Sequence, residues 1–320
     1  MRAAVSGRYG PPEVVRIVEV PTPPIAADQV LVRVAVTTVN RTDCGLRAAH
    51  PFFVRAFTGL RRPRAQIWGT EFAGTVTDVG ERVGSFTIGD RVFGYAENTF
   101  GAHAEYLAMP ADGPIAVVPA QLSLEHAAPS TEAAHYALCD IHAARIEAGQ
   151  EVLVHGATGA IGSAAVQLLA HLGARVTATC DTAHVDLVNS LGADRVIDRT
   201  LEDFTQDRQR YDVVFDSVGK SSFGACRHLL RPRGVYLSSD LGPHAQNLPL
   251  ALITRLRPGR RVMLPIGRRR DSAAIQHIAK LLHIGALRPV IDRSYPLARI
   301  VEAYHYVETG QKIGNVLITV

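Results

Sequence analysis

A chain of 320 residues is long for one domain and suits two, and 47% hydrophobic residues are enough to build buried cores. No apolar run approaches the roughly 18 residues of a membrane span, and the start of the chain has no apolar signal core, so we expect a cytoplasmic protein. The four cysteines are scattered without a C-x-x-C pair, which argues against a zinc ribbon or a disulfide framework. The net charge of +4 comes with no nucleic-acid motif, so no nucleic-acid partner is expected.

The first hundred residues predict strands and tight turns. Residues 29–39 (QVLVRVAVTTV) alternate apolar and polar side chains at period two, as a half-buried strand does. Residues 69–94 carry six glycines between short β-branched runs. We expect a small β-barrel or sandwich with antiparallel pairing.

The stretch NRTDCG, residues 40–45, follows the first of these strands. It places a thiol, Cys44, next to a carboxylate, Asp43. That pair is compatible with a metal site, an activated nucleophile or a purely structural turn, and the residues alone leave the choice open.

The pattern changes after about residue 118. Residues 151–181 read as an apolar strand, a glycine turn, an amphipathic helix and a second apolar strand, and the alternation continues over 185–198, 211–219 and 223–239. Strands that are apolar throughout and alternate with helices predict a doubly wound α/β domain with a parallel sheet covered on both faces.

A glycine-rich turn at residues 156–162 (GATGAIG) lies between the predicted strand and helix, which is the context of a dinucleotide fingerprint. Gly156 permits the tight turn, Gly159 lets the backbone approach a pyrophosphate, and Gly162 lets helix and strand pack closely. The pyrophosphate is expected on the helix N-terminus, whose amides favour negative charge. The other residues expected there are Thr158, Ala160 and Ile161.

Asp181 ends the second strand, 19 residues after Gly162, and fits the acid that holds the adenosine ribose. A carboxylate there favours NAD(H) over NADP(H) because it repels a 2′-phosphate, although Arg199 and His184 are near enough in sequence to offset it. The predicted cofactor site is completed by Cys180, Val218, Gly219 and Ser238.

Several motifs together resemble the medium-chain dehydrogenase/reductase superfamily, in its zinc-independent quinone oxidoreductase-like branch. The resemblance runs almost end to end, and it is carried by TTVNRTDCGLR, GTEFAGTVTDVGERVGSFTIGDRVFG, GAHAEYLAMPA, LSLEHAA, the glycine fingerprint, LGADRVID, YDVVFDSVG and GNVLITV. It implies a GroES-like, β-rich catalytic domain over 1–118, completed by 286–320, and an inserted Rossmann domain over 119–285. It also implies a cleft for nicotinamide and substrate, and commonly a homodimer.

The resemblance also bears on the open question at residues 40–45. Zinc-dependent relatives have a cysteine ligand where this chain has Asn40 and a histidine ligand where it has Thr70, and their third ligand position falls on Glu132. A catalytic zinc needs three protein ligands and an open position, and an amide and a hydroxyl are poor substitutes for imidazole and thiolate. We therefore expect no metal, and we interpret Cys44 as a packing residue.

Without zinc, hydrogen-bond donors must polarise the substrate carbonyl. Asn40 and Thr42 are the matching polar groups, and Thr42 lies where relatives keep a proton-relay hydroxyl. Asp43 either orients these groups or caps the turn after the strand. Tyr136 stands where branch members usually have threonine, and it is compatible with proton donation or with space filling.

The expected activity is hydride transfer from NAD(P)H to a small quinone or an α,β-unsaturated carbonyl compound. Three alternatives remain open: an alcohol dehydrogenase, a non-catalytic crystallin-like cofactor-binding protein, and an enoyl-thioester reductase. The arginine-rich stretch 255–270 is compatible with binding the carrier of a thioester, or with a solvated basic face.

Overall fold

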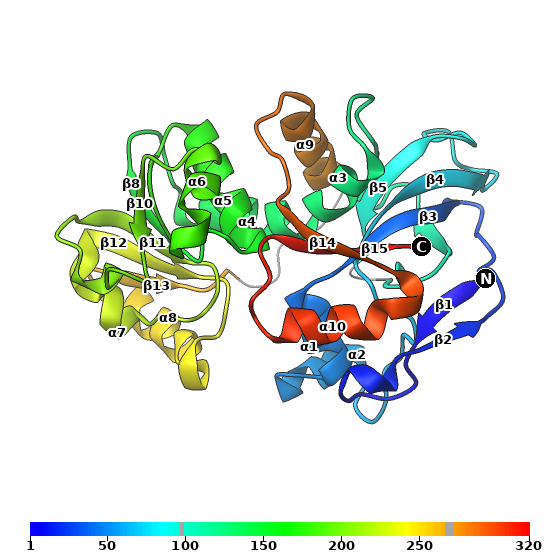
Figure 1. Cartoon of the computed structure of the whole chain (residues 1–320), viewed down its shortest axis with the longest axis horizontal. Coiled ribbons are helices and arrows are strands. Elements are labelled where there is room, and N and C mark those ends of the chain that lie inside the picture. The colour runs from blue at the N-terminus through cyan, green and yellow to red at the C-terminus, as the bar shows by residue number, and fades with distance from the viewer. Residues whose placement is uncertain (97–98, 266–271) are drawn as a thin grey trace. The chain divides into compact units, whose positions relative to one another are not determined.

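The computed structural model describes residues 1–96, 99–265 and 272–320, and the chain divides into two compact units. Unit 1 comprises Met1–Glu132 and Arg270–Val320, and unit 2 comprises Ala133–Arg269. In Figure 1 the elements from the two chain ends, coloured blue to blue-green and orange to red, build unit 1, whereas the green and yellow elements between them in the sequence build unit 2. The two boundaries differ from the expected 118/119 and 285/286. The first differs because α3 (Leu124–Ala127) packs on β3 (Gln29–Val39), β4 (Glu71–Val79) and β5 (Arg91–Tyr95), and the second because α9 (Ser272–His283) packs on β7 (Ile115–Val117).

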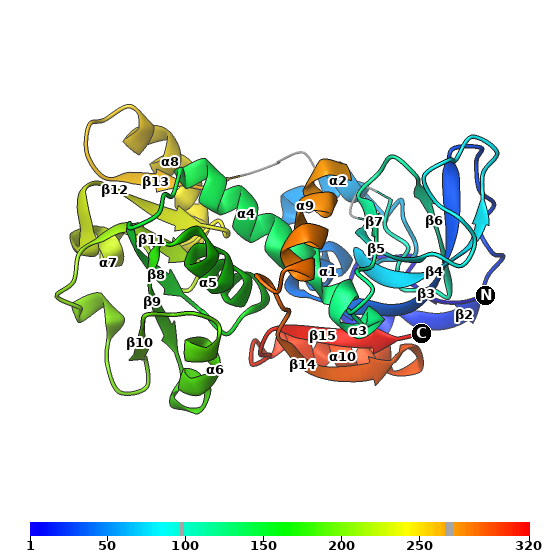
Figure 2. The same cartoon turned by 90° about the horizontal axis from the view of Figure 1, so that it is seen from above.

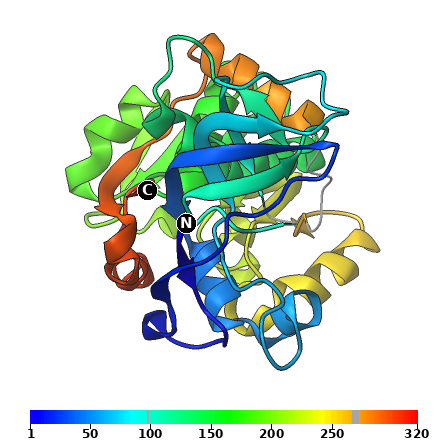
Figure 3. The same cartoon turned by 90° about the vertical axis from the view of Figure 1, so that its right-hand side faces the viewer.

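The main sheet of unit 1 has the order β14-β15-β3-β4-β5-β7 within the described residues, with β6 paired to β3. Its pairs are antiparallel, as predicted, except β14–β15. Both chain termini belong to this unit, and Figure 3 views it from that side. Its strands are β1 (Arg2–Val5), β2 (Arg16–Glu19), β3 (Gln29–Val39), β4 (Glu71–Val79), β5 (Arg91–Tyr95), β6 (Tyr106–Pro110), β7 (Ile115–Val117), β14 (Ile291–Pro296) and β15 (Asn315–Thr319). Its other α-helices are α1 (Arg41–Ala48), α2 (Arg55–Thr58) and α10 (Ile300–Glu308).

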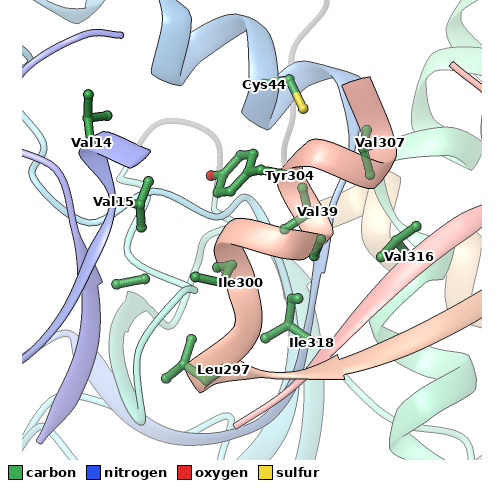
Figure 4. Close-up of a cluster of buried hydrophobic side chains, with 12 residues drawn as sticks. Val14, Val15, Val39, Cys44, Leu297, Ile300, Tyr304, Val307, Val316 and Ile318 are labelled. Carbon is green, nitrogen blue, oxygen red and sulfur yellow. The ribbon is translucent and has the colours of Figure 1, made fainter. Parts of the chain in front are cut away.

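One hydrophobic cluster of unit 1 fixes the position of α1 (Figure 4). Ile300, Tyr304 and Val307 share one face of α10 at helical spacing and are fully buried. Cys44, on α1, is 5% exposed within the same cluster, and burial raises the pKa of its thiol to about 12. The sequence-based interpretation of Cys44 as a packing residue is therefore confirmed, because a thiol with so high a pKa is neither an activated nucleophile nor a ready metal ligand.

The sheet of unit 2 has the order β10-β9-β8-β11-β12-β13 within the described residues, and all its pairs are parallel. Counted from β8, this is the 3-2-1-4-5-6 order of a doubly wound dinucleotide-binding fold, as predicted. Figure 2 shows α5 and α6 on one face of the sheet and α7 on the other. The strands are β8 (Glu151–His155), β9 (Arg175–Cys180), β10 (Arg195–Asp198), β11 (Tyr211–Asp216), β12 (Leu230–Ser238) and β13 (Arg261–Met263). The α-helices are α4 (Glu132–Ala144), which begins at the last residue of unit 1, α5 (Ala160–Leu172), α6 (Val185–Ser190), α7 (Phe223–Cys226) and α8 (Asn247–Arg255).

No helix among the described residues is both long enough and apolar enough to cross a membrane.

Candidate active site and cofactor site

Three carboxylates lie together in the interior of unit 1, and we call them the carboxylate cluster: Asp43, Glu71 and Glu132. Asp43 is in the first turn of α1, Glu71 is the first residue of β4, and Glu132 is the first residue of α4. Their exposed fractions are 0%, 0% and 5%. Burying three acidic groups is unfavourable unless each is hydrogen-bonded, paired with a cation or protonated.

Glu71 is surrounded by hydrogen-bond donors. Thr38 Oγ1 and Asn40 Nδ2 donate to its Oε2, each at 2.8 Å. Its Oε1 accepts from the Thr131 amide at 3.1 Å, the Thr131 hydroxyl at 2.8 Å and the Glu132 amide at 2.7 Å. Burial raises the pKa of Glu71, and these donors oppose that rise because they stabilise the carboxylate form.

Glu132 has a different set of partners. Its Oε1 hydrogen-bonds the Thr42 hydroxyl, and its Oε2 the Thr70 hydroxyl at 3.3 Å. Burial first, and then the charges of Glu71 and Asp43, raise the pKa of Glu132 well above its ordinary value. Glu132 is therefore the group in the cluster whose surroundings most favour the protonated acid.

Asn40 and Asp43 are tied to each other and to the cluster. Asp43 Oδ2 accepts from the backbone amide of Asn40 at 2.8 Å and so caps the N-terminus of α1. Burial raises the pKa of Asp43 to about 7. The side-chain amide of Asn40 is committed to Glu71, and its Oδ1 is a buried acceptor without a partner among the described residues. Asn40 and Thr42 were the two groups expected to hold a substrate oxygen. Because the Asn40 amide is bonded to Glu71, the half-buried Thr42 hydroxyl is the remaining donor of the two.

Lys312, in the loop between α10 and β15, supplies positive charge to the cluster. Its Nζ donates to the carbonyl oxygen of Gly314. Burial lowers the pKa of Lys312, whereas the charges of Glu132 and Glu71 act to raise it. Sequence reasoning missed this residue, because nothing in the pattern around position 312 relates it to residues 40–71.

Three further members of the site were missed: Thr38, Glu71 and Thr131. Glu71 directly follows Thr70, which occupies a zinc-ligand position of the relatives, so its place in the sequence was a usable signal. Thr38 is the second-to-last residue of β3, whose last four residues are all buried, and a threonine there has the pattern of an ordinary β-branched strand residue.

The residues at the relatives' zinc-ligand positions do not fit a zinc ion. The nitrogen of the Asn40 side chain is an amide donor already bonded to Glu71, and a neutral hydroxyl is the only ligand atom that Thr70 offers. Both oxygens of Glu132 are engaged by hydroxyls. No group of three or more His, Cys, Asp or Glu side chains suited to a metal ion occurs in the part of the chain that the structure describes.

Tyr136 lies four residues after Glu132 in α4, so the two share one face of that helix. Its ring is half-buried and meets His135 edge-on, with 6.1 Å between the ring centroids.

The glycine turn of unit 2 has the geometry that a dinucleotide requires. Gly156 has a φ of +85°, and a Cβ there would lie 2.5 Å from Val218 Cγ1. A Cβ at Gly162 would lie 2.1 Å from the carbonyl oxygen of Gly156. Gly159, the N-cap of α5, has an ordinary φ of −70°, and its Cβ would meet nothing closer than 3.4 Å. The protein itself therefore requires glycine at 156 and 162, whereas the glycine at 159 leaves space in front of the helix for a ligand.

The other predicted cofactor residues lie around this turn and at the carboxyl ends of the parallel strands. Asp216, the last residue of β11, pairs in register with His155 of β8 and with Ser238 of β12. Ser238 therefore ends a strand at the level of the glycine turn. Val218 and Gly219 follow β11 at the same edge of the sheet. Such carboxyl ends, at the reversal of strand order between β8 and β11, are where ligands bind in doubly wound sheets. Thr158 lies in the turn itself, Ala160 and Ile161 lie in the first turn of α5, and His184 lies in a short 3-10 helix over Thr182–His184.

Asp181 follows β9 and forms a two-point ion pair with Arg199, which follows β10. The Arg199 Nε lies 2.6 Å from Asp181 Oδ1, and its Nη2 donates to Oδ2 at 2.8 Å. The register that pairs Cys180 with Asp198 brings these two residues side by side. The carboxylate predicted to hold a ribose is therefore paired with a guanidinium whose side chain is 52% exposed.

Comparison with known proteins agrees with this architecture. Residues 26–120 match the family described as alcohol dehydrogenase GroES-like domain, and residues 191–318 match the family described as zinc-binding dehydrogenase. The chain is 30% identical to 2-methylene-furan-3-one reductase of Solanum lycopersicum, covering 97% of this chain and 76% of that protein. It is 32% identical to the quinone oxidoreductase of Lama guanicoe, covering 95% and 92%.

Among solved structures, the quinone oxidoreductase from Coxiella burnetii matches with a TM-score of 0.87 at 26% identity, covering 100% of this chain and 99% of that one. These likenesses, with the strand order of unit 2 and the GroES-like match of unit 1, confirm the expected family. The chain belongs to the medium-chain dehydrogenase/reductase superfamily, in its quinone oxidoreductase-like branch.

Proposed function

We propose that this chain is a zinc-independent reductase that uses NAD(P)H to reduce a quinone or an α,β-unsaturated carbonyl compound. The observation that carries the proposal is the nature of the residues at the relatives' zinc positions. Of these residues, Glu132 belongs to the carboxylate cluster, and Asn40 and Thr70 hydrogen-bond its members instead of offering ligands to a metal ion. Unit 2 retains a complete glycine turn. Two relatives at 30% and 32% identity are named for the reduction of a furanone and of quinones.

A nicotinamide cofactor bound at the glycine turn would supply the hydride. The backbone from Gly156 to Gly162 would hold the pyrophosphate, and the first-turn amides of α5, which lack partners within the helix, would face its negative charge. Asp181 would hold the adenosine ribose.

On the substrate side, the Thr42 hydroxyl would donate to the carbonyl oxygen, which gains negative charge during reduction. Asn40 would act by holding Glu71, and Asp43 by capping α1 so that Thr42 keeps its position. Tyr136, on the same face of α4 as Glu132, is the alternative proton donor that the sequence suggested.

The choice between NADH and NADPH depends on the Asp181–Arg199 pair. The carboxylate alone favours NADH, but the bidentate guanidinium offsets its charge and can bind a 2′-phosphate. We propose that the site accepts both cofactors, with Asp181 contributing a preference for NADH.

We further propose that the protein is a cytoplasmic homodimer. All four cysteines are free thiols, which suits a reducing compartment, and dimers are common in the branch. Sedimentation velocity on the purified chain tests the assembly, and a monomer at micromolar concentration would contradict it.

The deciding experiment measures oxidation of NADH and of NADPH with quinones, enones and enoyl thioesters after treatment with a chelator. We expect turnover that the chelator does not reduce. Activity that disappears with the chelator and returns with zinc would instead support an alcohol dehydrogenase type of site. Tight cofactor binding without turnover on any acceptor would support a non-catalytic binding protein.

A second candidate, reduction of enoyl thioesters, is favoured by exposed arginines before and at the start of β13. Arg255, Arg257 and Arg261 are exposed, whereas residues 266–270 of the same stretch lie outside the described residues. A phosphate-bearing carrier bound there would make activity on thioesters, but not on simple enones, fall steeply as salt is raised.

A further inference from the structure

We propose that Glu132 is the acid that supplies the proton in this reduction, and that it acts through the hydroxyl of Thr42. The inference rests on the proposed function and adds to it a catalytic residue at the end of a two-residue proton relay. Its basis is the contrast between the hydrogen-bond partners of Glu71 and those of Glu132.

The partners of Glu71 hold it as a carboxylate. Three of its five donors are N–H groups, from the backbone of Thr131 and Glu132 and from the side chain of Asn40, and an amide N–H cannot act as an acceptor. A proton on Glu71 could be accepted only by the Thr38 or the Thr131 hydroxyl, and that hydroxyl would then stop donating while the three N–H groups continued to favour the carboxylate. The Asn40 amide must also keep this orientation, because turning it over would bring its carbonyl oxygen against a carboxylate.

The partners of Glu132 allow it to carry a proton. Both are hydroxyls, from Thr42 and Thr70, and a hydroxyl can donate or accept. When Glu132 is protonated, its O–H can donate to Thr42 Oγ1, and the proton of Thr42 is then free to point elsewhere. When Glu132 is ionised, the Thr42 proton turns back to it, so the relay is set only in the acid form.

The charge balance of the interior favours the same assignment. Asp43, Glu71 and Glu132 are all buried, and Lys312 is the cation whose charge acts on both glutamates. One cation does not balance three carboxylates, so the cluster retains at least one proton near neutral pH. Of the two glutamates, Glu132 has fewer donors and feels the negative charge of Glu71. The two glutamates are thus a pair whose surroundings push their pKa values apart.

The position of Thr42 makes it the link to the substrate. Glu132 is 5% exposed, whereas the Thr42 side chain is half-buried. As hydride adds to the acceptor, the electron pair of the reduced double bond moves to oxygen. That oxygen takes the Thr42 proton while the O–H bond of Glu132 breaks and a new O–H bond forms on Thr42. Glu132 is left as a carboxylate, and it regains a proton from water before the next turnover.

The first test compares Glu132→Gln with Glu105→Gln, a matched substitution of a partly exposed carboxylate of the same unit that pairs with Arg2. Because the acid form is the active one, the turnover of the wild type should fall as pH rises through the pKa of Glu132. Glu132→Gln should lower turnover by about 10²–10⁴-fold and remove that fall, since an amide cannot give up a proton. Glu105→Gln should match the wild type at every pH. A fall with pH that persists in Glu132→Gln, at wild-type turnover, would overturn the proposal.

Thr42 is tested by a pair of substitutions. Thr42→Val should lose turnover as Glu132→Gln does, and Thr42→Ser, which restores a hydroxyl, should recover most of it. Full activity in Thr42→Val would mean that Glu132 does not act through this residue. Thermal unfolding of each variant shows whether any loss reflects folding instead.

A second readout needs neither cofactor nor substrate. In the wild-type protein at pH 7, infrared spectroscopy should show a carbonyl band of protonated carboxylic acids, one component of which is lost in Glu132→Gln and kept in Glu105→Gln. Asp43, whose pKa burial raises to about 7, adds a component of its own that Asp43→Asn identifies. If the wild type reduces an acceptor but the band is unchanged in Glu132→Gln, the relay fails and the proposed function stands. If the wild type reduces no acceptor, the proposed function fails first, and the band still reports whether Glu132 carries the proton.

Discussion

The substitutions Gly162→Ala and Gly159→Ala should have different effects, although the two glycines belong to one motif. The first should lower stability, and the second should weaken cofactor binding. At Gly162 a Cβ would lie 2.1 Å from the Gly156 carbonyl oxygen and 2.7 Å from Ser217 Oγ. The nearest atom is backbone and cannot turn aside, so α5 must shift away from the strand end. Overpacking of this kind costs about 1–3 kcal/mol, which for a domain of this size lowers Tm by about 4–12 °C.

At Gly159 the protein has room for the new atom, since its nearest neighbour would be 3.4 Å away and φ is −70°. The expected loss of stability is about 0.5–1 kcal/mol, because alanine is a poorer N-cap than glycine. The same Cβ would occupy the space through which the pyrophosphate approaches. We expect the Kd of NADPH to rise at least about tenfold, or about 1.4 kcal/mol.

Thermal unfolding followed by circular dichroism and titration of NADPH fluorescence measure the two effects. The Tm of Gly159→Ala should be close to that of the wild type while its binding of NADPH is weak. The Tm of Gly162→Ala should be well below that of the wild type. The reasoning is refuted if Gly162→Ala melts with the wild type, or if Gly159→Ala binds NADPH as tightly as the wild type does.

Three further outcomes are expected. Arg199→Ala should weaken the binding of NADPH by about tenfold relative to that of NADH, and Asp181→Asn should strengthen the binding of NADPH relative to that of NADH. Equal effects on the two cofactors in binding titrations would contradict the role of the ion pair. Tyr136→Phe should keep full turnover and the wild-type pH profile, and a large loss measured with every acceptor would make Tyr136 the proton donor instead. Burial raises the pKa of Asp43 to about 7. Between about pH 4 and 7 the folded chain therefore holds a proton that the unfolded chain releases. The free energy of unfolding should fall as pH rises through this window. Asp43→Asn should flatten that fall in urea unfolding, and an unchanged slope would place the titration elsewhere.

The fold of unit 2 was predictable from local patterns. The strand at 151–155 has an apolar centre and is followed by a glycine turn and a helix, and these features predicted the parallel sheet and the expected place of a dinucleotide. The sequence also identified Asp181 and Arg199 as neighbours, although the bidentate geometry of their pair required the register of β9 and β10.

The carboxylate cluster was not predictable in the same way. Its members come from residues 43, 71 and 132 and its cation from residue 312, so long-range packing alone brings them together. Local signals for these residues point to other roles: Glu71 opens a strand and Asp43 caps a helix. The resemblance to zinc-dependent relatives indicated the location of the site. Only the hydrogen bonds show that Asn40, Thr70 and Glu132, at the relatives' ligand positions, bond to neighbouring carboxylates and hydroxyls.

The cluster differs from a zinc site in how its charge is balanced. A zinc ion brings two fixed positive charges, whereas here neutrality depends on Lys312 and on protons, so the charge of the site changes with pH. The donors that hold Glu71 therefore decide where the proton resides. If the Asn40 side-chain amide were lost, Glu71 would lose one of its three fixed donors and would compete with Glu132 for the proton. In the relay that we propose, Asn40 would therefore influence proton transfer at Thr42 without touching the substrate, and an amide at the relatives' ligand position would suit a reductase that needs no zinc.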